Sequence, residues 1–188
     1  MISEKEILNL LQQQQDQKRY EHTLRVVKTA EELAIRFGAP VAKVRLAAYL
    51  HDLAKCLPLT ELSSILEKNG LDCYLNYSSK VWHAPAGAIL SKIRYNITDI
   101  EVLGAVRYHA TGRPDMGLVE EIVFLADYIE PARRQPGVEQ IRELSKKSLK
   151  IAIRHTLANT VEYLESGDKT RIHPDTLAAN KYYSRLES

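Results

Sequence analysis

The apolar residues of this chain recur at three- and four-residue steps, which is the spacing of an amphipathic helix. The clearest run covers residues 24–37, with apolar side chains at Leu24, Val27, Ala30, Ala34 and Phe37. Charged side chains largely fill the opposite face of that run. Gly38 and Pro40 mark its end and the start of the next helix, because Gly favours the position after a helix and Pro the first turn.

The same spacing predicts further helices over residues 7–11, 41–53, 61–68, 85–94, 99–108, 118–129, 138–165 and 175–186. Segment 138–165 is expected to be one continuous helix that ends at Gly167. Thr98 or Asp99 is expected to cap the helix that begins there. Residues 71–80 and 111–117 are expected to be loops; the second contains two Gly and one Pro. No segment alternates as a strand does and no repeat is present.

These patterns predict an all-α protein in which 1–188 forms one compact domain. Its core is expected over about 18–135, and C-terminal helices over 138–186. The length of 188 residues suits one domain, and the 45% apolar and 27% charged fractions are those of an ordinary soluble protein. The net charge of +2 is too small to indicate nucleic acid as a bulk partner, and the Arg133-Arg134 pair lacks a wider basic stripe.

The two cysteines, Cys56 and Cys73, form no CxxC pair, and we expect Cys56 to be a buried thiol. The polar segment 1–17 does not resemble a signal peptide. No apolar stretch approaches the roughly 20 residues that span a bilayer. We therefore expect a cytoplasmic protein without a membrane partner.

Candidate chemistry begins with His51-Asp52. Adjacent helical side chains point about 100° apart, yet both can converge on one ion beyond the end of a helix. An imidazole with a carboxylate suits Fe, Mn, Zn, Co or Ni. An isolated His-Asp pair is common without any function, so the other candidate ligands in the sequence decide whether this pair indicates a metal site.

Further candidates are His22, His83, His109 and Asp127. Asp127 lies in the apolar stretch 124–128, where a carboxylate is costly to bury without a cation or strong donors. The alternatives are an exposed or arginine-paired Asp127, and hydrogen-bonded structural histidines. His155 and His173 are assigned no chemistry.

The order of His22, His51-Asp52 and Asp127 resembles the HD-domain metal-dependent phosphohydrolases, with similar contexts at 20–26 (YEHTLRV), 50–55 (LHDLAK) and 125–127 (LAD). Segments 82–83 (WH), 108–112 (YHATG) and 126–133 (ADYIEPAR) resemble the YqeK family in particular. Its members are bacterial HD-domain hydrolases that cleave diadenosine tetraphosphate symmetrically to ADP. The resemblance extends from about residue 19 to the C-terminal helix, and HDLAK and HATG are its most specific parts.

This resemblance implies two metal ions, of which iron is the expected identity and manganese, cobalt and zinc are alternatives. One ion would be held by His22, His51, Asp52 and Asp127. The other would be held by His83 and His109, with Asp52 as the bridge. A hydroxide between the ions would attack phosphorus. Asp52 and Lys55 are the expected catalytic residues.

Substrate binding is expected from side chains near these ligands: Arg25, Lys55, Thr111, Gly112, Arg113, Tyr128 and Arg133. Arg25 and Lys55 each lie one helical turn after a predicted ligand, and arginine forks suit phosphate. The alternative for each cation is a solvated surface charge. Tyr77, Trp82, Tyr108 and Tyr128 are candidates to stack on adenine, although at least two should pack in the core.

Three other functions stay open. A related nucleotidase or cyclic-nucleotide phosphodiesterase would use one metal. A nucleotide- or ribosome-associated regulatory module would bind without turnover. A purely structural helical protein would carry its histidines by chance. The expected partner is a dinucleoside polyphosphate, a homodimer is possible, and no sensor or output domain is expected.

Overall fold

The computed structural model describes residues 3–167 and 171–186, so the ends of the predicted 1–188 domain lie outside it. The described residues form helices and no strands, which confirms the all-α prediction. The α-helices are α1 (Glu4–Gln14), α2 (Gln17–Phe37), α3 (Val41–Leu50), α4 (Leu59–Lys68), α5 (His83–Tyr95), α6 (Ile100–Tyr108), α7 (Leu118–Ile129), α8 (Val138–Ser145), α9 (Leu149–Ser166) and α10 (Pro174–Tyr183). In none of them is the sequence long and apolar enough to cross a membrane.

Local sequence signals begin and end these helices. The Asp16 side chain accepts a hydrogen bond from the Arg19 N–H and so caps α2, which ends at Gly38 with a left-handed φ of 71°. The Asp99 side chain caps α6 by accepting from the N–H groups of Glu101 and Val102. The end of α2 and the start of α6 therefore lie where the sequence predicted.

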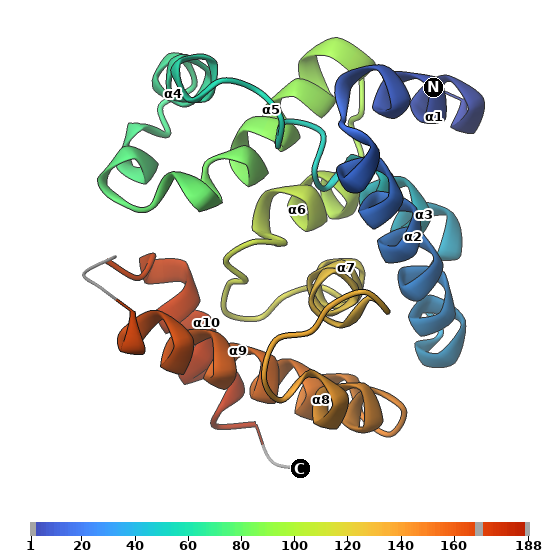
Figure 1. Cartoon of the computed structure of the whole chain (residues 1–188), viewed down its shortest axis with the longest axis vertical. Coiled ribbons are helices and arrows are strands. Elements are labelled where there is room, and N and C mark those ends of the chain that lie inside the picture. The colour runs from blue at the N-terminus through green and yellow to red at the C-terminus, as the bar shows by residue number, and fades with distance from the viewer. Residues whose placement is uncertain (1–2, 168–170, 187–188) are drawn as a thin grey trace.

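Helix α7 lies at the centre of the molecule, with α2, α3, α6 and α9 packed around it (Figure 1). Residues 119–126 are all buried, including two glutamates. A helix that is apolar on nearly all sides is stable only when other helices cover it. Placing α7 in the middle brings Asp127, near its C-terminal end, beside the ends of several other helices.

Helix α3 is shorter than predicted, because it ends at Leu50 and not at Leu53. The chain continues as a tight turn in which the Leu53 N–H donates to the Leu50 carbonyl and the Lys55 N–H to the Asp52 carbonyl. These bonds span three residues and not four, so the turn is wound more tightly than an α-helix. The turn places His51 and Asp52 together in the interior.

The prediction of one helix over 138–165 is wrong. Helices α8 and α9 are separated at Ser148, which has extended backbone angles and caps α9 by accepting from the Ile151 N–H. The buried positions continue at helical spacing through the break, at Val138, Ile141, Ser145, Leu149, Ala152 and Ile153. Periodicity alone therefore could not reveal where the chain turns.

Three smaller expectations also differ from the structure. The segment predicted as a loop over 71–80 contains two short 3₁₀ helices, η1 (Asp72–Asn76) and η2 (Ser79–Val81). The last helix ends at Tyr183 and not at Leu186. Cys56, expected to be buried, is exposed, because the tight turn after α3 directs it outward.

Candidate metal centre

Six predicted ligands come together where five helical elements meet. His22 lies on α2, and His51 and Asp52 come directly after α3. His83 is the first residue of α5, His109 comes directly after α6, and Asp127 is near the end of α7. All but Asp127 are buried, and the Asp127 side chain is 20% exposed.

Asp52 lies at the middle of this cluster and faces two pairs of histidines with its two oxygens. Its Oδ2 is 3.8 Å from His22 Nε2 and 3.4 Å from His51 Nε2. Its Oδ1 is 3.1 Å from His83 Nε2 and 3.7 Å from His109 Nε2. One carboxylate thus separates two groups of nitrogen donors.

Two of these imidazoles are oriented by backbone carbonyls. His51 Nδ1 lies 2.6 Å from the Ala48 oxygen, and His109 Nδ1 lies 2.8 Å from the Val106 oxygen. Because a carbonyl can only accept, each Nδ1 must carry a proton, and each Nε2 is the ring nitrogen that faces the cluster. This is the arrangement in which a histidine commonly binds a metal.

His22 is oriented by a carboxylate. Its Nδ1 lies 3.1 Å from Glu130 Oε1, and its Nε2 lies 3.1 Å from Asp127 Oδ1. The Glu130 side chain is buried and also accepts from Arg25 Nε and from the Ala132 N–H. Glu130 thus holds His22 in place from the side opposite to the cluster.

The donor set fits divalent metal ions. Among the described residues, the buried Nε2 atoms of His22 and His51 find no hydrogen-bond partner of suitable geometry, which is costly unless a bound ion or molecule satisfies them. Donor atoms lie within 4.8 Å of one another in two groups that share Asp52: His22 with His51, and His83 with His109. Nitrogen and carboxylate oxygen donors together suit first-row transition metals.

The electrostatics keep the carboxylates charged. Burial opposes ionisation of Asp52, but His51, His109 and His83 outweigh it and hold its pKa well below the usual value. The pKa of Asp127 is likewise lowered, against the effect of burial, by His22 and Arg133. Burial lowers the pKa of His83 to about 4, so this imidazole is neutral near pH 7 and its lone pair is available.

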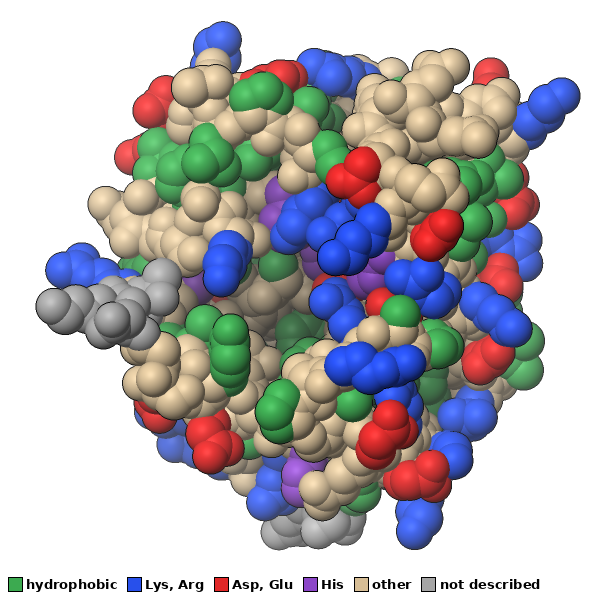
Figure 2. All heavy atoms as spheres, in the orientation of Figure 1, with side chains coloured by type: hydrophobic (Ala, Val, Ile, Leu, Met, Phe, Trp, Pro, Cys, Tyr) green, Lys and Arg blue, Asp and Glu red, His purple; other side chains and the backbone are tan. Residues whose placement is uncertain are grey.

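A cavity of about 980 Å³ extends from the cluster toward α9 and α10. Buried Asp52, His83 and His109 line one part of it, and the exposed Tyr163 of α9 lines another. Figure 2 shows this face hollowed near its middle, where histidine side chains lie beside a group of Lys and Arg. The volume of the cavity lies at the upper end of the range for pockets that bind small molecules.

The predicted substrate-binding residues divide into two groups. Those that line the cavity are Lys55, Thr111, Tyr128 and Arg133. Lys55 Nζ lies 3.3 Å from His83 Nδ1, and Arg133 donates to the backbone carbonyl and the carboxylate of Asp127.

The other three lie elsewhere. Arg25 is bonded to Glu130, and Arg113 makes a two-pronged bond to Glu120. Gly112 has a left-handed φ of 66° and packs beside Leu157. None of these three residues lines the cavity, and a contact between them and substrate remains a prediction.

Three of the four aromatic candidates are engaged within the fold and do not line the cavity. The Trp82 indole donates to the Tyr74 and Tyr77 carbonyls. The Tyr77 ring meets His173 edge to face, and Tyr108 lies against two arginines. Only Tyr128 is on the cavity wall, so it is the aromatic candidate best placed to meet a base.

Two residues of the site were not predicted. Arg19 Nη1 donates to Asp52 Oδ2 over 2.6 Å and lines the cavity. Glu130 contacts His22 although 108 residues separate them. An arginine at the start of a polar helix carries no distinguishing signal. For Glu130 the signal was weak: a carboxylate directly after the largely apolar helix α7.

The candidate ligands fall within a segment that this chain shares with known proteins. The family model of the HD domain matches residues 19–132, which contain all six candidate ligands. The chain belongs to the HD-domain family. Within that family it is 43% identical over 172 residues to a symmetrical bis(5'-nucleosyl)-tetraphosphatase of Halalkalibacterium halodurans, covering 91% of each chain. It is 39% identical over 176 residues to a protein of the same name from Bacillus subtilis, covering 93% of this chain and 94% of that one.

A solved structure agrees with this assignment. A Clostridium acetobutylicum protein, described as an HD superfamily hydrolase involved in NAD metabolism, superposes with a TM-score of 0.91 at 35% identity. The alignment covers 99% of this chain and 100% of the other. The match includes α8–α10, so the C-terminal helices that wall the cavity are part of the shared fold, beyond the HD-matched segment.

Proposed function

We propose that this HD-domain protein is a metal-dependent hydrolase that cleaves diadenosine tetraphosphate symmetrically, so that water and one dinucleotide yield two ADP. The observation that carries the proposal is the Asp52 carboxylate, which faces two pairs of buried histidines and lines a cavity of about 980 Å³. The substrate is inferred from two relatives, at 39% and 43% identity, that are named symmetrical bis(5'-nucleosyl)-tetraphosphatases.

We propose that His22, His51, Asp52 and Asp127 hold one ion, and that His83 and His109 share Asp52 to hold a second. Ions bound there would lower the pKa of water and neutralise phosphate oxygens. Iron is the proposed metal, with manganese, cobalt and zinc as alternatives. A cytoplasmic location and a homodimer remain further proposals.

The cations of the cavity would hold the tetraphosphate. Arg19, Lys55 and Arg133 line the cavity close to Asp52, where the central phosphoanhydride would have to lie for symmetrical cleavage. Arginine forks bind phosphate through two parallel bonds, and lysine acts as a point charge. Thr111 and Tyr128 would contact the remainder of the substrate. Lys55 would be the cation best placed to stabilise the departing ADP.

We also propose that Arg25, Gly112 and Arg113 contribute to substrate binding. Arg25 would act on the site through Glu130, to which it is bonded. Arg113 and Gly112 would have to reach substrate from the loop beside His109, and Arg113 would have to leave Glu120.

Substitution of Asp52 tests the proposal. We expect Asp52→Asn to lose bound metal and turnover while the far-UV circular dichroism stays helical, because both proposed ions share this carboxylate. Asp72→Asn, on exposed η1, is the matched control and should retain both. Metal content by elemental analysis and nucleotide products by chromatography are the measurements. Normal turnover by Asp52→Asn, or ATP and AMP as products, would contradict the proposal.

The same measurements separate the alternatives. One equivalent of metal that is unaffected by loss of His83 and His109 would favour a one-metal nucleotidase or phosphodiesterase. Metal and nucleotide binding without any product would favour a regulatory module. No binding of Fe, Mn or Co would favour a structural protein.

A further inference from the structure

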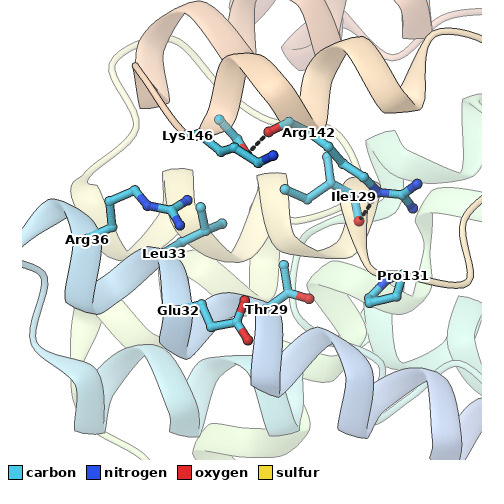
Figure 3. A pocket seen from close by; sticks show the side chains of 9 residues that line it. Thr29, Glu32, Leu33, Arg36, Ile129, Pro131, Arg142 and Lys146 are labelled. Carbon is cyan, nitrogen blue, oxygen red and sulfur yellow. Dashed lines mark hydrogen bonds between the residues drawn. The ribbon is translucent and has the colours of Figure 1, made fainter.

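Arg142, on α8, bonds to several backbone carbonyls of the turn after α7. Its Nε donates to the Ile129 carbonyl at 2.9 Å, and its Nη2 donates to the Glu130 and Arg133 carbonyls at 2.7 and 3.1 Å. The side chain is only 18% exposed. Figure 3 shows Arg142 reaching toward Ile129 at the end of α7.

Part of this arrangement is ordinary helix capping. The last carbonyls of a helix lack partners within it, and a cation near them is favourable. The other bonds of Arg142 reach beyond the end of α7. They hold the backbone of Glu130 and Arg133, whose side chains contact His22 and Asp127.

We propose that Arg142 is a positioning residue for the metal centre: by fixing the backbone at Glu130, it holds the Glu130 carboxylate against His22 Nδ1. This inference rests on the proposed metal-dependent function. It assigns a role in the site to a helix outside the HD-matched residues 19–132. Arg142 touches neither the candidate ligands nor the cavity beside them.

The local geometry supports a specific role for the guanidinium. One planar group satisfies three carbonyls, and its Nη1 is held by Glu139 at 2.5 Å. Lysine carries its three donors on one nitrogen and lacks the planar fork whose separate Nε and Nη2 atoms meet these carbonyls. Glu130 itself is fixed on its other side by Arg25 and the Ala132 N–H. Without Arg142, the backbone of Glu130 would lose its hydrogen bond from α8, while the carboxylate would keep its bonds to Arg25 and Ala132.

The same turn provides a matched control. Arg134 Nη1 also donates to two carbonyls, those of Pro131 and Arg133, at 2.6 and 2.9 Å. Arg134 is exposed and makes no bond to Glu130. A general effect of losing an arginine here would appear in both variants, whereas a positioning role appears only at Arg142.

The experiment is a titration of metal-free protein with Mn²⁺, in the wild type and five variants: Arg142→Ala, Arg142→Lys, Arg134→Ala, Glu130→Ala and the double variant of Glu130→Ala with Arg142→Ala. We expect Arg142→Ala and Arg142→Lys to weaken binding about tenfold, and Arg134→Ala to stay within about twofold of wild type. Glu130→Ala should itself bind Mn²⁺ more weakly than the wild type. Adding Arg142→Ala to Glu130→Ala should lower the Mn²⁺ affinity by no more than a further factor of about two. Measurement well below the melting temperature excludes partial unfolding. If Arg142→Ala does not fold, Arg142→Lys replaces it, both in the wild-type protein and in the Glu130→Ala protein.

Chemical rescue of Mn²⁺ binding and NMR of the metal-free protein provide two further readouts. A cavity of about 330 Å³ beside Arg142, lined by Thr29, Leu33 and Ile129 among others, gives a small guanidinium compound access from the surface. Millimolar guanidinium should restore Mn²⁺ affinity to Arg142→Ala. ¹⁵N NMR should report a smaller Nδ1–H population of His22 in that variant.

Equal effects at Arg142 and Arg134, or an undiminished effect of Arg142→Ala in the Glu130→Ala background, would overturn the inference. Wild-type protein that binds no Mn²⁺, Fe²⁺ or Co²⁺ would instead overturn the proposed function. The two failures are therefore distinguishable.

Discussion

At the scale of single residues, the site depends on which atoms face which. Each oxygen of Asp52 faces a different pair of histidines, so this one carboxylate is placed to serve both of the proposed ions. His51 and His109 show how the backbone contributes, because one carbonyl fixes the proton on Nδ1 of each ring. Lys55 differs from these residues because an ammonium cannot bind a metal ion while it is charged.

Lys55→Ala should therefore separate catalysis from metal binding. Lys55 Nζ lies within 3.4 Å of both His83 ring nitrogens and lines the cavity, where it can stabilise charge on substrate oxygens. We expect turnover to fall about 100-fold, as for loss of one donor to a developing charge, with metal content unchanged. Steady-state kinetics with elemental analysis measures both. Lys43→Ala, at a surface ion pair with Glu101, should change neither; metal loss in Lys55→Ala would indicate a structural role instead.

At the scale of elements, helix capping determined where α8 and α9 separate, which the periodicity of buried positions could not reveal. Segment 138–165 keeps its buried positions at helical spacing through the junction of α8 and α9. The break is made by Ser148, whose hydroxyl accepts from the Ile151 N–H at 3.3 Å. This junction places α8, and with it Arg142, beside the end of α7 while α9 lines the cavity.

Removal of the Ser148 hydroxyl should weaken this junction. Ser148→Ala leaves one N–H of the first turn of α9 without its cap, and we expect a loss of about 1 kcal/mol in the free energy of unfolding. Urea denaturation followed by circular dichroism gives the value. The control is Ser184→Ala, which removes an exposed hydroxyl just after the C-terminal end of α10. Its free energy of unfolding should stay within about 0.5 kcal/mol of the wild-type value. Equal effects of the two substitutions would argue against a capping role for Ser148.

At the scale of the whole molecule, the C-terminal helices are tied to the core by a buried carboxylate. Glu121 on α7 is 2% exposed and accepts from Tyr183 Oη on α10 at 2.6 Å and from Lys150 Nζ on α9 at 2.5 Å. The bond from Tyr183 joins residues 62 positions apart. Since α9 walls the cavity, this link connects the docking of the helices to the shape of the site.

Tyr183→Phe should test this link. The substitution keeps the ring and removes the hydroxyl, leaving Glu121 with one donor fewer in the interior, and should cost about 1–3 kcal/mol of stability. Tyr182→Phe is the neighbouring control, because that hydroxyl bonds to Asp115 at the surface, and it should cost less than about 0.5 kcal/mol. Thermal and urea unfolding compare the two. A Tyr183→Phe protein as stable as Tyr182→Phe would show that packing alone holds α10.

Sequence alone determined the helical class, most helix boundaries, the candidate ligands and the family resemblance. These features depend on short-range spacing, on helix-end signals such as Gly38 and Asp99, and on motifs such as HDLAK, all of which are local. Only the tertiary structure decided that Asp52 faces both pairs of histidines, that Glu130 supports His22, and that Arg142 reaches the end of α7. The physical reason is distance along the chain: packing brings together residues such as His22 and Glu130, which are 108 positions apart, and no local pattern records that contact.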